Sequence, residues 1–303
     1  MPVIEVQELH KRYRDHVAVH DVSLSVEQGE IFGICGRNGA GKTTTVECIG
    51  GLRAADGGRI SVLGLDPRRD RDELRRAVGI QLQASELPDR MRVGEAVELF
   101  AAFYPDPADG DDLIERWGLA AKRRTAFGKL SGGQKQRLSI VLALIGRPKV
   151  AILDELTTGL DPQARRDTWA AIEQIRDSGV TVVLVTHFME EAERLCDRIA
   201  VIDAGRVLAV DSPAGLVTGL PAGQRLRFRP STDFPDAVLT GLPEVHEVRR
   251  SGPTVEVTGH GDLLQVVTAA LAAHQVLPAD LRLDQPTLDD AFVALTGRAA
   301  AED

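Results

Sequence analysis

The sequence predicts an α/β protein built on a parallel sheet, followed by a smaller α+β domain. At 303 residues, the chain is long enough for about two domains of common size. Two largely apolar runs, Val150–Leu153 and Val180–Val185, flank a segment with helical spacing, Gln163–Asp177. Continuous apolar strands in a strand–helix–strand order are typical of a parallel sheet with both faces covered. After Ser212 the pattern changes, and shorter alternating segments follow.

The first domain is expected over residues 1–212, and its further elements can be taken in order. The strands have alternating or continuous apolar residues, and they are Val3–Val6, Val22–Val26, Ile31–Cys35 and the hairpin pair Ile199–Ile202 and Arg206–Val210. The helices have apolar residues at helical spacing, and they are Lys42–Ile49, a helical insert over about 84–128, and Gln134–Ile145. Gly50 and Gly146 follow two of these helices, as expected at helix ends.

The second domain is expected over residues 213–303. Its elements alternate between strand and helix patterns, and they are a strand at Arg225–Arg229, a helix near 232–240, strands near 244–250 and 254–258, a helix at Asp262–His274 and a strand near 280–284. The resulting βαββαβ order is that of a ferredoxin-like arrangement. A last helix is expected at Leu288–Leu295, before Gly297.

Composition excludes several classes of protein. The chain carries 36 basic and 45 acidic residues, a formal charge of −9, so bulk charge does not suit it to coat nucleic acid or anionic lipid. Aromatic residues make up only 4%, which argues against a base-stacking surface. The three cysteines are scattered, which predicts neither a zinc site nor a disulfide framework. No secretory signal and no apolar run of membrane-spanning length is visible, so a cytoplasmic protein is expected.

A glycine-rich loop follows the strand expected at Ile31–Cys35. It reads Gly36-Arg37-Asn38-Gly39-Ala40-Gly41-Lys42-Thr43-Thr44 and fits the phosphate-binding pattern G-x-x-x-x-G-K-[ST]. Glycines let backbone N–H groups surround phosphate oxygens, and the positive end of the next helix points at the same anion. Lys42 is expected to reach the β- and γ-phosphates, and Thr43 to bind Mg²⁺. An ordinary glycine-rich turn is the alternative, but the strand before the loop and the helix after it favour the phosphate site.

Two acids end the strand expected at Val150–Leu153. Asp154 is expected to hold Mg²⁺ through water, and Glu155 to polarise the water that attacks the γ-phosphate. Taken alone, the pair could equally be the solvated end of an ordinary strand. The glycine-rich loop upstream favours the catalytic interpretation.

A second candidate anion site lies in the octapeptide Leu130-Ser131-Gly132-Gly133-Gln134-Lys135-Gln136-Arg137. Ser131 can cap the following helix, while Gly132 and Gly133 leave bare N–H groups at its start. A simple helix cap is the alternative. The octapeptide resembles the signature of the ATP-binding cassette (ABC) family, LSGGQ, and the similarity of spacing extends over roughly residues 3–212. The resemblance implies an ABC-type nucleotide-binding domain of the P-loop class, with a mixed sheet and a helical subdomain.

Further residues gain a role from this resemblance. Tyr13 matches the aromatic residue that stacks on adenine, and His187 matches the histidine that contacts the γ-phosphate. Gln83, preferred over Gln81 on register, matches the glutamine that links Mg²⁺ and the attacking water to the transport partner. Asp161, in Gly159-Leu160-Asp161, matches the loop that crosses the dimer interface. The family usually has proline after the catalytic glutamate, whereas this chain has Leu156, which is expected to loosen that turn slightly.

The implied ligands are ATP and Mg²⁺. The expected catalytic residues are Glu155, His187 and Gln83, and the expected metal ligands are Thr43, Gln83 and Asp154. The residues expected to contact ATP are Tyr13, Gly36, Arg37, Asn38, Gly39, Ala40, Gly41, Lys42, Thr43, Thr44, Ser131, Gly132, Gly133, Gln134 and Asp161. The resemblance also implies an ATP-dependent homodimer of two-fold symmetry, in which Ser131 to Gly133 of one subunit complete the site of the other.

Two functions remain open on the sequence. The first is the ATPase subunit of a membrane transporter, bound to a separate multi-span permease on the inner face of the cell membrane, with no nucleic-acid partner. The second is a soluble ABC ATPase that acts on ribosomes or DNA. The single cassette and the absence of zinc modules favour the first. The tail over residues 286–298 resembles that of daunorubicin-resistance-type export ATPases, which implies export of drugs, antibiotics or lipids and an accessory or regulatory domain at 213–303.

Overall fold

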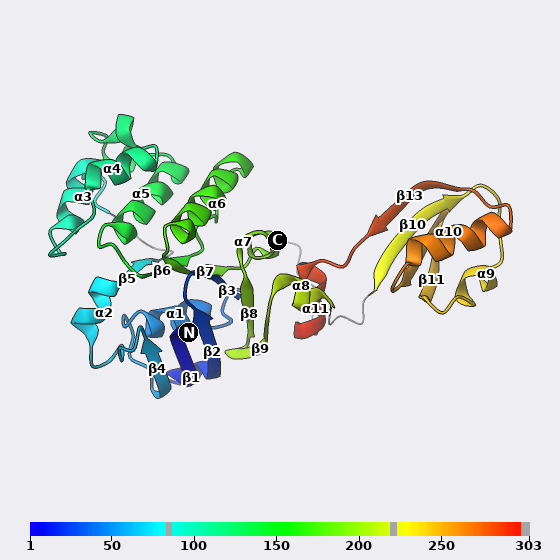
Figure 1. Cartoon of the computed structure of the whole chain (residues 1–303), viewed down its shortest axis with the longest axis horizontal. Helices are drawn as coiled ribbons and strands as arrows, with labels where there is room; N and C mark the ends of the chain where they lie inside the picture. Colours follow the sequence, from blue (N-terminus) through cyan, green and yellow to red (C-terminus); the bar gives the residue numbers. More distant parts are fainter. Residues whose placement is uncertain (83–86, 219–222, 298–303) are drawn as a thin grey trace. The chain divides into compact units, whose positions relative to one another are not determined.

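The computed structural model describes residues 1–82, 87–218 and 223–297 (Figure 1). The chain divides into two compact units, Met1–Pro213 and Ala214–Asp303, which are described separately. In the described residues, no helix is both long enough and apolar enough to cross a membrane.

Six strands form the central sheet of the first unit. Their order across the sheet is β5 (Val78–Gln81), β6 (Val150–Asp154), β7 (Thr181–Thr186), β3 (Ile31–Cys35), β8 (Arg198–Asp203) and β9 (Arg206–Asp211). Neighbouring strands are parallel except β8 and β9, which pair antiparallel. Every residue of β3, β6 and β7 is buried, because helices or a second sheet cover both faces. The predicted α/β fold with a mixed sheet is confirmed.

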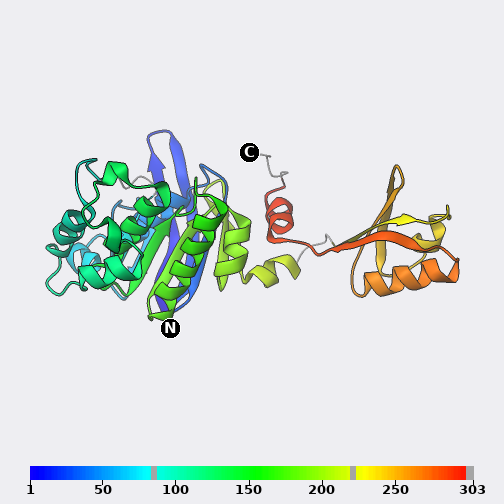
Figure 2. The same cartoon turned by 90° about the horizontal axis from the view of Figure 1, so that it is seen from above.

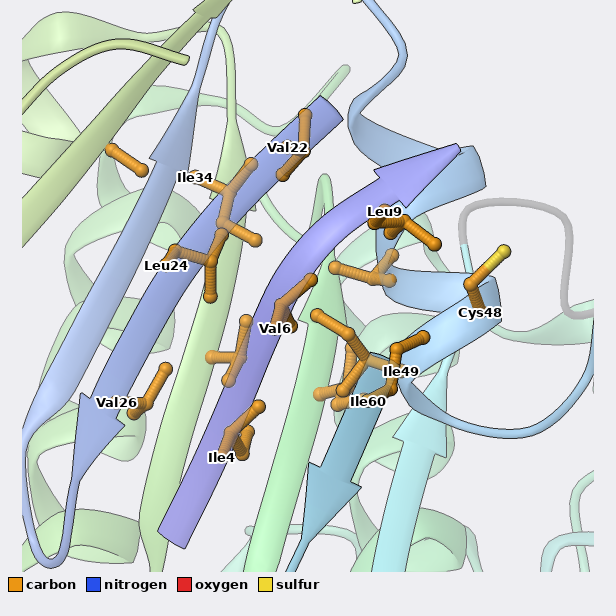
Figure 3. Packing of buried hydrophobic residues seen from close by; sticks show 14 of the residues in the cluster. Ile4, Val6, Leu9, Val22, Leu24, Val26, Ile34, Cys48, Ile49 and Ile60 are labelled. Atoms are coloured by element: carbon orange, nitrogen blue, oxygen red, sulfur yellow. The ribbon is translucent and has the colours of Figure 1, made fainter. Parts of the chain in front are cut away.

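A three-stranded antiparallel sheet packs on one side of the central sheet. It consists of β2 (His16–Glu27), β1 (Pro2–Tyr13) and β4 (Gly57–Val62), in that order. β1 and β2 are longer than the strands expected from the sequence, and β4 was not expected at all. Figure 3 shows their inward side chains around α1 (Lys42–Ile49) and the central sheet. Ile4, Val6, Val22, Val26 and Ile49 are all almost fully buried in this core.

Helices cover the other side of the central sheet (Figure 1). The helices that contact the sheet are α5 (Gly132–Leu144), α6 (Pro162–Asp177) and α7 (Met189–Leu195), while α3 (Val93–Ala101) and α4 (Gly110–Arg116) pack against α5. Two short 3₁₀ helices, η1 (Ala120–Lys122) and η2 (Phe127–Lys129), lie between α4 and α5 in the chain. The interval 87–128 is therefore helical, as expected. A further helix that was not predicted, α2 (Arg71–Ala77), precedes β5.

The second unit contains a four-stranded antiparallel sheet. Its order is β11 (Val245–Ser251), β12 (Thr254–Gly259), β10 (Gln224–Pro230) and β13 (Pro278–Asp284). Figure 2 shows the helix α10 (Leu263–Ala273) along one face of this sheet. Phe228, Val257 and Val267 belong to the core between them. The predicted βαββαβ order is confirmed.

Three further helices belong to this part of the chain: one is shorter than predicted, one was not predicted, and the last one was predicted. The helix expected near 232–240 is only one turn long, α9 (Ala237–Thr240), because Pro235 cannot donate a helical hydrogen bond and the helix starts after it. The short helix α8 (Pro213–Thr218), which was not predicted, begins at the boundary between the units. The final helix, α11 (Leu288–Thr296), is capped by Thr287 at its start and by Gly297, in a left-handed conformation, at its end.

Candidate nucleotide-binding site

The phosphate-binding loop connects the end of β3 to the start of α1, as the motif requires. Gly41, the residue before the first turn of α1, has φ 99°, a conformation that disfavours residues with a side chain. A Cβ at Gly41 would lie 2.4 Å from the Ala18 carbonyl oxygen, and one at Gly36 would lie 2.2 Å from that of Ile202. Neighbouring backbone therefore holds the loop in place and requires glycine at both positions.

Lys42 is turned inward and is only 4% exposed. Its ammonium group donates hydrogen bonds to the carbonyl oxygens of Gly36, at 2.8 Å, and Arg37, at 3.1 Å. Burial lowers the pKa of Lys42, and the nearby carboxylates of Glu155 and Asp154 oppose that shift. The lysine thus provides a positive charge inside the curve of its own loop, at the place where phosphate oxygens are expected.

Asp154 ends β6 and is fully buried. The Thr43 hydroxyl donates to its Oδ2 at 3.0 Å, while its Oδ1 is buried and has no hydrogen-bond partner in the described part of the chain. Burial is the main cause that raises the pKa of Asp154 to about 6. A hydroxyl oxygen beside an unsatisfied carboxylate oxygen fits Mg²⁺, which takes oxygen ligands and usually keeps several waters or phosphate oxygens. Across the described residues no cluster of three or more His, Cys, Asp or Glu side chains could hold a metal ion, so protein side chains alone would not complete the coordination.

Glu155 follows directly and has an unusual backbone conformation. Its φ is 50°, and its N–H donates to the Val185 carbonyl oxygen at 2.9 Å. Its Oε1 lies 3.7 Å from the Lys42 ammonium nitrogen and 3.3 Å from Nδ1 of His187, which follows the end of β7. The structure thus brings Lys42, Asp154, Glu155 and His187 together at the carboxyl ends of β3, β6 and β7.

Gln81 and Gln83 are the two candidates for the glutamine that links Mg²⁺ and the attacking water to the transport partner, and the structure describes only Gln81. Gln81 is buried: its side-chain oxygen accepts from the Asp154 N–H at 3.2 Å, and its side-chain nitrogen donates to the Leu82 carbonyl at 2.7 Å. Its amide therefore has a structural role behind Asp154. Gln83 lies outside the described residues, and its assignment stays a prediction.

A cavity of about 510 Å³ opens over the loop. Eight of the residues expected to contact ATP or to act in catalysis line it, from β1, the phosphate loop, the start of α1 and the position directly after β6, and they are Tyr13, Asn38, Gly39, Gly41, Lys42, Thr43, Thr44 and Glu155. Cations also lie close to the Tyr13 ring, with the Lys11 ammonium 5.6 Å and the Arg53 guanidinium 5.1 Å from its centroid. His16 and Ala18 complete the lining. They were not predicted, because only the packing of the β1–β2 hairpin against the loop brings them there.

The remaining loop residues support the cradle without lining the cavity. The Arg37 carbonyl accepts from the Ala40 N–H at 3.1 Å as well as from Lys42. Ala40 is buried, and its carbonyl accepts from the Gly205 N–H at 2.9 Å.

The candidate signature residues lie elsewhere in the unit, at the start of α5. Ser131 caps that helix by accepting from the Gln134 N–H, and the Gln134 side chain accepts in turn from the Ser131 N–H. Neither these two residues nor Gly132 and Gly133 line the cavity over the phosphate loop. Asp161 caps α6, accepting from two backbone N–H groups at 3.0 Å. The structure therefore groups the phosphate loop with the acids, but not with the signature.

A strand–loop–helix phosphate cradle, with two acids at the end of another parallel strand of the same sheet, defines a P-loop nucleoside triphosphatase. Comparison with known proteins identifies the family within this class of protein. Residues 19–158 match the family model described as ABC transporter. A daunorubicin resistance ATP-binding protein of Streptomyces coeruleorubidus is 36% identical, covering 97% of this chain and 96% of its own. A Nod factor export ATP-binding protein of Ralstonia nicotianae is 35% identical, covering 98% and 94%.

Solved structures agree with these relatives. The structure of an ATP-binding subunit of an ABC transporter superposes with a TM-score of 0.65 at 28% identity, covering 71% of this chain and 92% of that one. A dimeric ATP-binding cassette bound to ADP and phosphate superposes with a TM-score of 0.63 at 26% identity, covering 69% and 98%. The chain belongs to the ABC transporter family, as an ATP-binding and ATP-hydrolysing subunit. The predicted transporter function is thereby favoured over the soluble alternative.

Proposed function

We propose that this chain is the ATPase of an exporter, and that it works as a dimer with a separate membrane-spanning subunit on the inner face of the cell membrane. The cavity that joins Tyr13, the phosphate loop and Glu155 is the observation that carries the ATPase assignment. Export is supported by relatives named for daunorubicin resistance and Nod factor export, whose similarity extends through both units of the chain. The cargo we propose is correspondingly a drug, an antibiotic or a lipid-like molecule.

In this proposal, Tyr13 stacks on adenine and the loop N–H groups surround the phosphates. Lys42 exchanges its bonds to the Gly36 and Arg37 carbonyls for bonds to the β- and γ-phosphates. Thr43 and Asp154 would hold Mg²⁺, which when bound would supply positive charge to the phosphates. Glu155 accepts a proton from the attacking water, and its position next to His187 lets the histidine contact the same γ-phosphate.

The separation of the two anion sites supports the proposed dimer. The N-terminus of α5 is a ready anion site with a hydroxyl and two glycines, and it lies away from the cavity of its own chain. A second copy, related by a two-fold axis, would present Ser131, Gly132 and Gly133 to the γ-phosphate bound by the first. ATP would then hold the two copies together, and hydrolysis would release them.

A second cavity supports the docking of the membrane subunit. It measures about 450 Å³ and is lined by residues of α2 and β5 and by residues that follow α1 and α3, including Leu52, Arg76, Ile80 and Phe103. Leu52 is 46% and Phe103 69% exposed, so this cavity offers apolar surface that a partner could cover. We propose that a cytoplasmic segment of the membrane subunit, with an apolar residue between polar ones, occupies this groove.

The test uses tagged Glu155→Gln protein, purified with ATP from detergent-solubilised membranes. Losing a general base lowers kcat by about 10²–10⁴-fold, and the variant should form stable dimers that bring a multi-span membrane protein with them. Phe103→Asp should lose that protein and keep its own ATP affinity. Leu277→Asp, at a site 70% exposed in the second unit, is the matched control and should retain it. Wild-type turnover in Glu155→Gln would refute the role of Glu155, and ribosomal or DNA-repair proteins in place of a membrane protein would refute the transporter assignment.

A further inference from the structure

A fully buried glutamate lies behind the nucleotide site, in a place that the functions above do not use. Glu191, in α7, has no exposed surface. Carboxylates are almost never buried to this extent unless they are paired with a cation. Among the described residues no lysine or arginine forms an ion pair with Glu191. The Trp169 indole N–H, a neutral donor, lies 3.0 Å from Oε1 of Glu191, whereas Oε2 has no hydrogen-bond partner among the described residues.

Three separate elements meet at this carboxyl group. Trp169 belongs to α6. Burial raises the pKa of Glu191, and the hydroxyls of Thr186, at the end of β7, and Thr157, in the loop after β6, lower it, which places both hydroxyls near the carboxyl. Among the described residues, neither Glu191 Oε2 nor the Thr157 hydroxyl has a hydrogen-bond partner within bonding geometry. Thr157 and Thr186 are themselves almost fully buried. Glu191 therefore lies where α6, to which it is hydrogen-bonded, meets the loops that leave β6 and β7.

These two loops carry the groups expected to act on the γ-phosphate. Thr157 comes two residues after Glu155, and Thr186 comes immediately before His187. The Thr186 hydroxyl also accepts from the Phe188 N–H at 3.0 Å, which fixes the backbone on the far side of His187. Beyond it, the Arg165 guanidinium stacks 4.7 Å from the Phe188 ring centroid. His187 Nδ1 and Glu155 Oε1, which are 3.3 Å apart, therefore belong to two loops that each place a threonine, Thr186 or Thr157, near Glu191.

Packing alone does not account for a carboxylate at this position. An apolar side chain of similar volume would fill the space without the cost of burying a charge, and such replacements are often neutral or stabilising. A carboxylate, by contrast, accepts hydrogen bonds from several donors at once and sets their directions. We propose that Glu191 is a positioning residue for ATP hydrolysis: it holds the Glu155 loop and the His187 loop in register through Thr157, Thr186 and Trp169. This inference rests on the roles proposed above for Glu155 and His187.

The test compares Glu191→Gln with Glu193→Gln in the full-length protein. Both changes are isosteric and lie in the same helix, but Glu193 is exposed. Because a small misplacement of catalytic groups costs up to about 100-fold in rate, we expect Glu191→Gln to lower kcat by about 10- to 100-fold, with KM for ATP and ATP affinity within about twofold of wild type. Glu193→Gln should hydrolyse ATP like the wild type. Trp169→Phe, which removes only the indole donor, should lower kcat in the same direction.

A double-mutant cycle separates positioning from general damage to the fold. If Glu191 acts through Glu155 and His187, then Glu191→Gln should change the single-turnover rate of a Glu155→Gln, His187→Ala double variant by less than about twofold, because both groups that it positions are already gone. Additive losses, or a lower melting temperature with unchanged kcat in both Glu191→Gln and Trp169→Phe, would overturn the inference. If Glu155→Gln and His187→Ala hydrolyse ATP normally, the proposed site fails instead. Should Glu191→Gln not fold, Trp169→Phe with the same cycle decides the question.

Discussion

Replacing Lys42 with methionine tests the phosphate cradle most directly. Methionine keeps an unbranched apolar stem in a site where the lysine is only 4% exposed, so packing changes little. The change removes the charge that lies 3.7 Å from Glu155 and donates to two carbonyls of its own loop, at 2.8 and 3.1 Å. The expected result is a large loss of ATP affinity with a smaller loss of stability.

The magnitudes follow from which bonds are exchanged. Bonds from an ammonium to phosphate oxygens are charged on both sides and are about twice as strong as bonds to neutral carbonyls. Exchanging the Gly36 and Arg37 carbonyls for phosphate oxygens should therefore gain about 2–4 kcal/mol, which corresponds to about 30- to 700-fold in ATP affinity. Removing one partner from a buried ion pair costs about 3–5 kcal/mol. Here the loss should be smaller, since burial already disfavours the charged form of Lys42.

Isothermal titration with ATP, in the presence of Mg²⁺, measures the first quantity, and thermal unfolding measures the second. Lys149→Met is the matched control, because Lys149 is exposed in the loop before β6. An ATP affinity of Lys42→Met within threefold of wild type, in folded protein, would refute the reasoning, since Lys42 would then contribute nothing to phosphate binding.

Three further predictions concern the glycine loop, the cysteines and the buried glutamate. Gly41→Ala should lower the free energy of unfolding by at least about 1–3 kcal/mol, which is the cost of a strained left-handed residue. The loss should be no smaller than this, because the added Cβ would also lie 2.4 Å from the Ala18 carbonyl oxygen. Thermal unfolding measures the loss of stability, and ATP titration measures any loss of affinity. Cys35, Cys48 and Cys196 are buried, and burial raises the pKa of Cys35 to about 12 and of Cys48 to about 11, so a thiol reagent at about pH 8 should label them only after denaturation. Burial raises the pKa of Glu191 in the folded chain. The stability that the protonated carboxyl contributes is therefore fully present below the pKa of the unfolded chain, and it is lost as pH rises through the pKa of the folded chain. The melting temperature of the wild type should accordingly fall relative to that of Glu191→Gln between about pH 5 and about pH 8.

Each of these predictions has a result that would contradict it. Gly39 also has a positive φ, but a Cβ there meets open space, so Gly39→Ala should be the milder change; equal losses at both glycines would show that the Ala18 contact is unimportant. Rapid labelling of native protein would show that the cysteines are accessible. Parallel melting curves for wild type and Glu191→Gln across the pH range would show that the carboxyl does not titrate differently in the folded chain.

Strands that are buried on both faces of the sheet could be predicted from the sequence. β3, β6 and β7 are runs of apolar residues, and nothing but a core strand accounts for such a run next to a helix pattern. β4 could not be predicted, because it begins Gly57-Gly58-Arg59 and buries only Ile60 and Val62. Two buried positions are too few to show the alternation of apolar and polar residues that is typical of a strand. β4 is held by pairing with β1, a partner distant in the sequence.

The same distinction applies to the candidate site. The phosphate loop and the two acids were predictable, because their chemistry is encoded in consecutive residues. His16 was not, since it reaches the cavity only through the packing of a hairpin. Glu191 was not either: Glu190, Glu191 and Glu193 resemble the solvated face of a short helix, and only the tertiary structure turns one of them toward Trp169.

The position of β3 within the central sheet also has a consequence for how the protein is made. β3 lies between β7 and β8, and Ile31 pairs with Val182, about 150 residues later in the chain. A nascent chain that has just emerged with its complete glycine loop therefore lacks both neighbours of the strand that carries it. Joining such distant segments is slow, because a long stretch must first lose its freedom. The capacity to hydrolyse ATP should thus arise late in synthesis, after β7 and β8 have been translated, rather than with the loop itself.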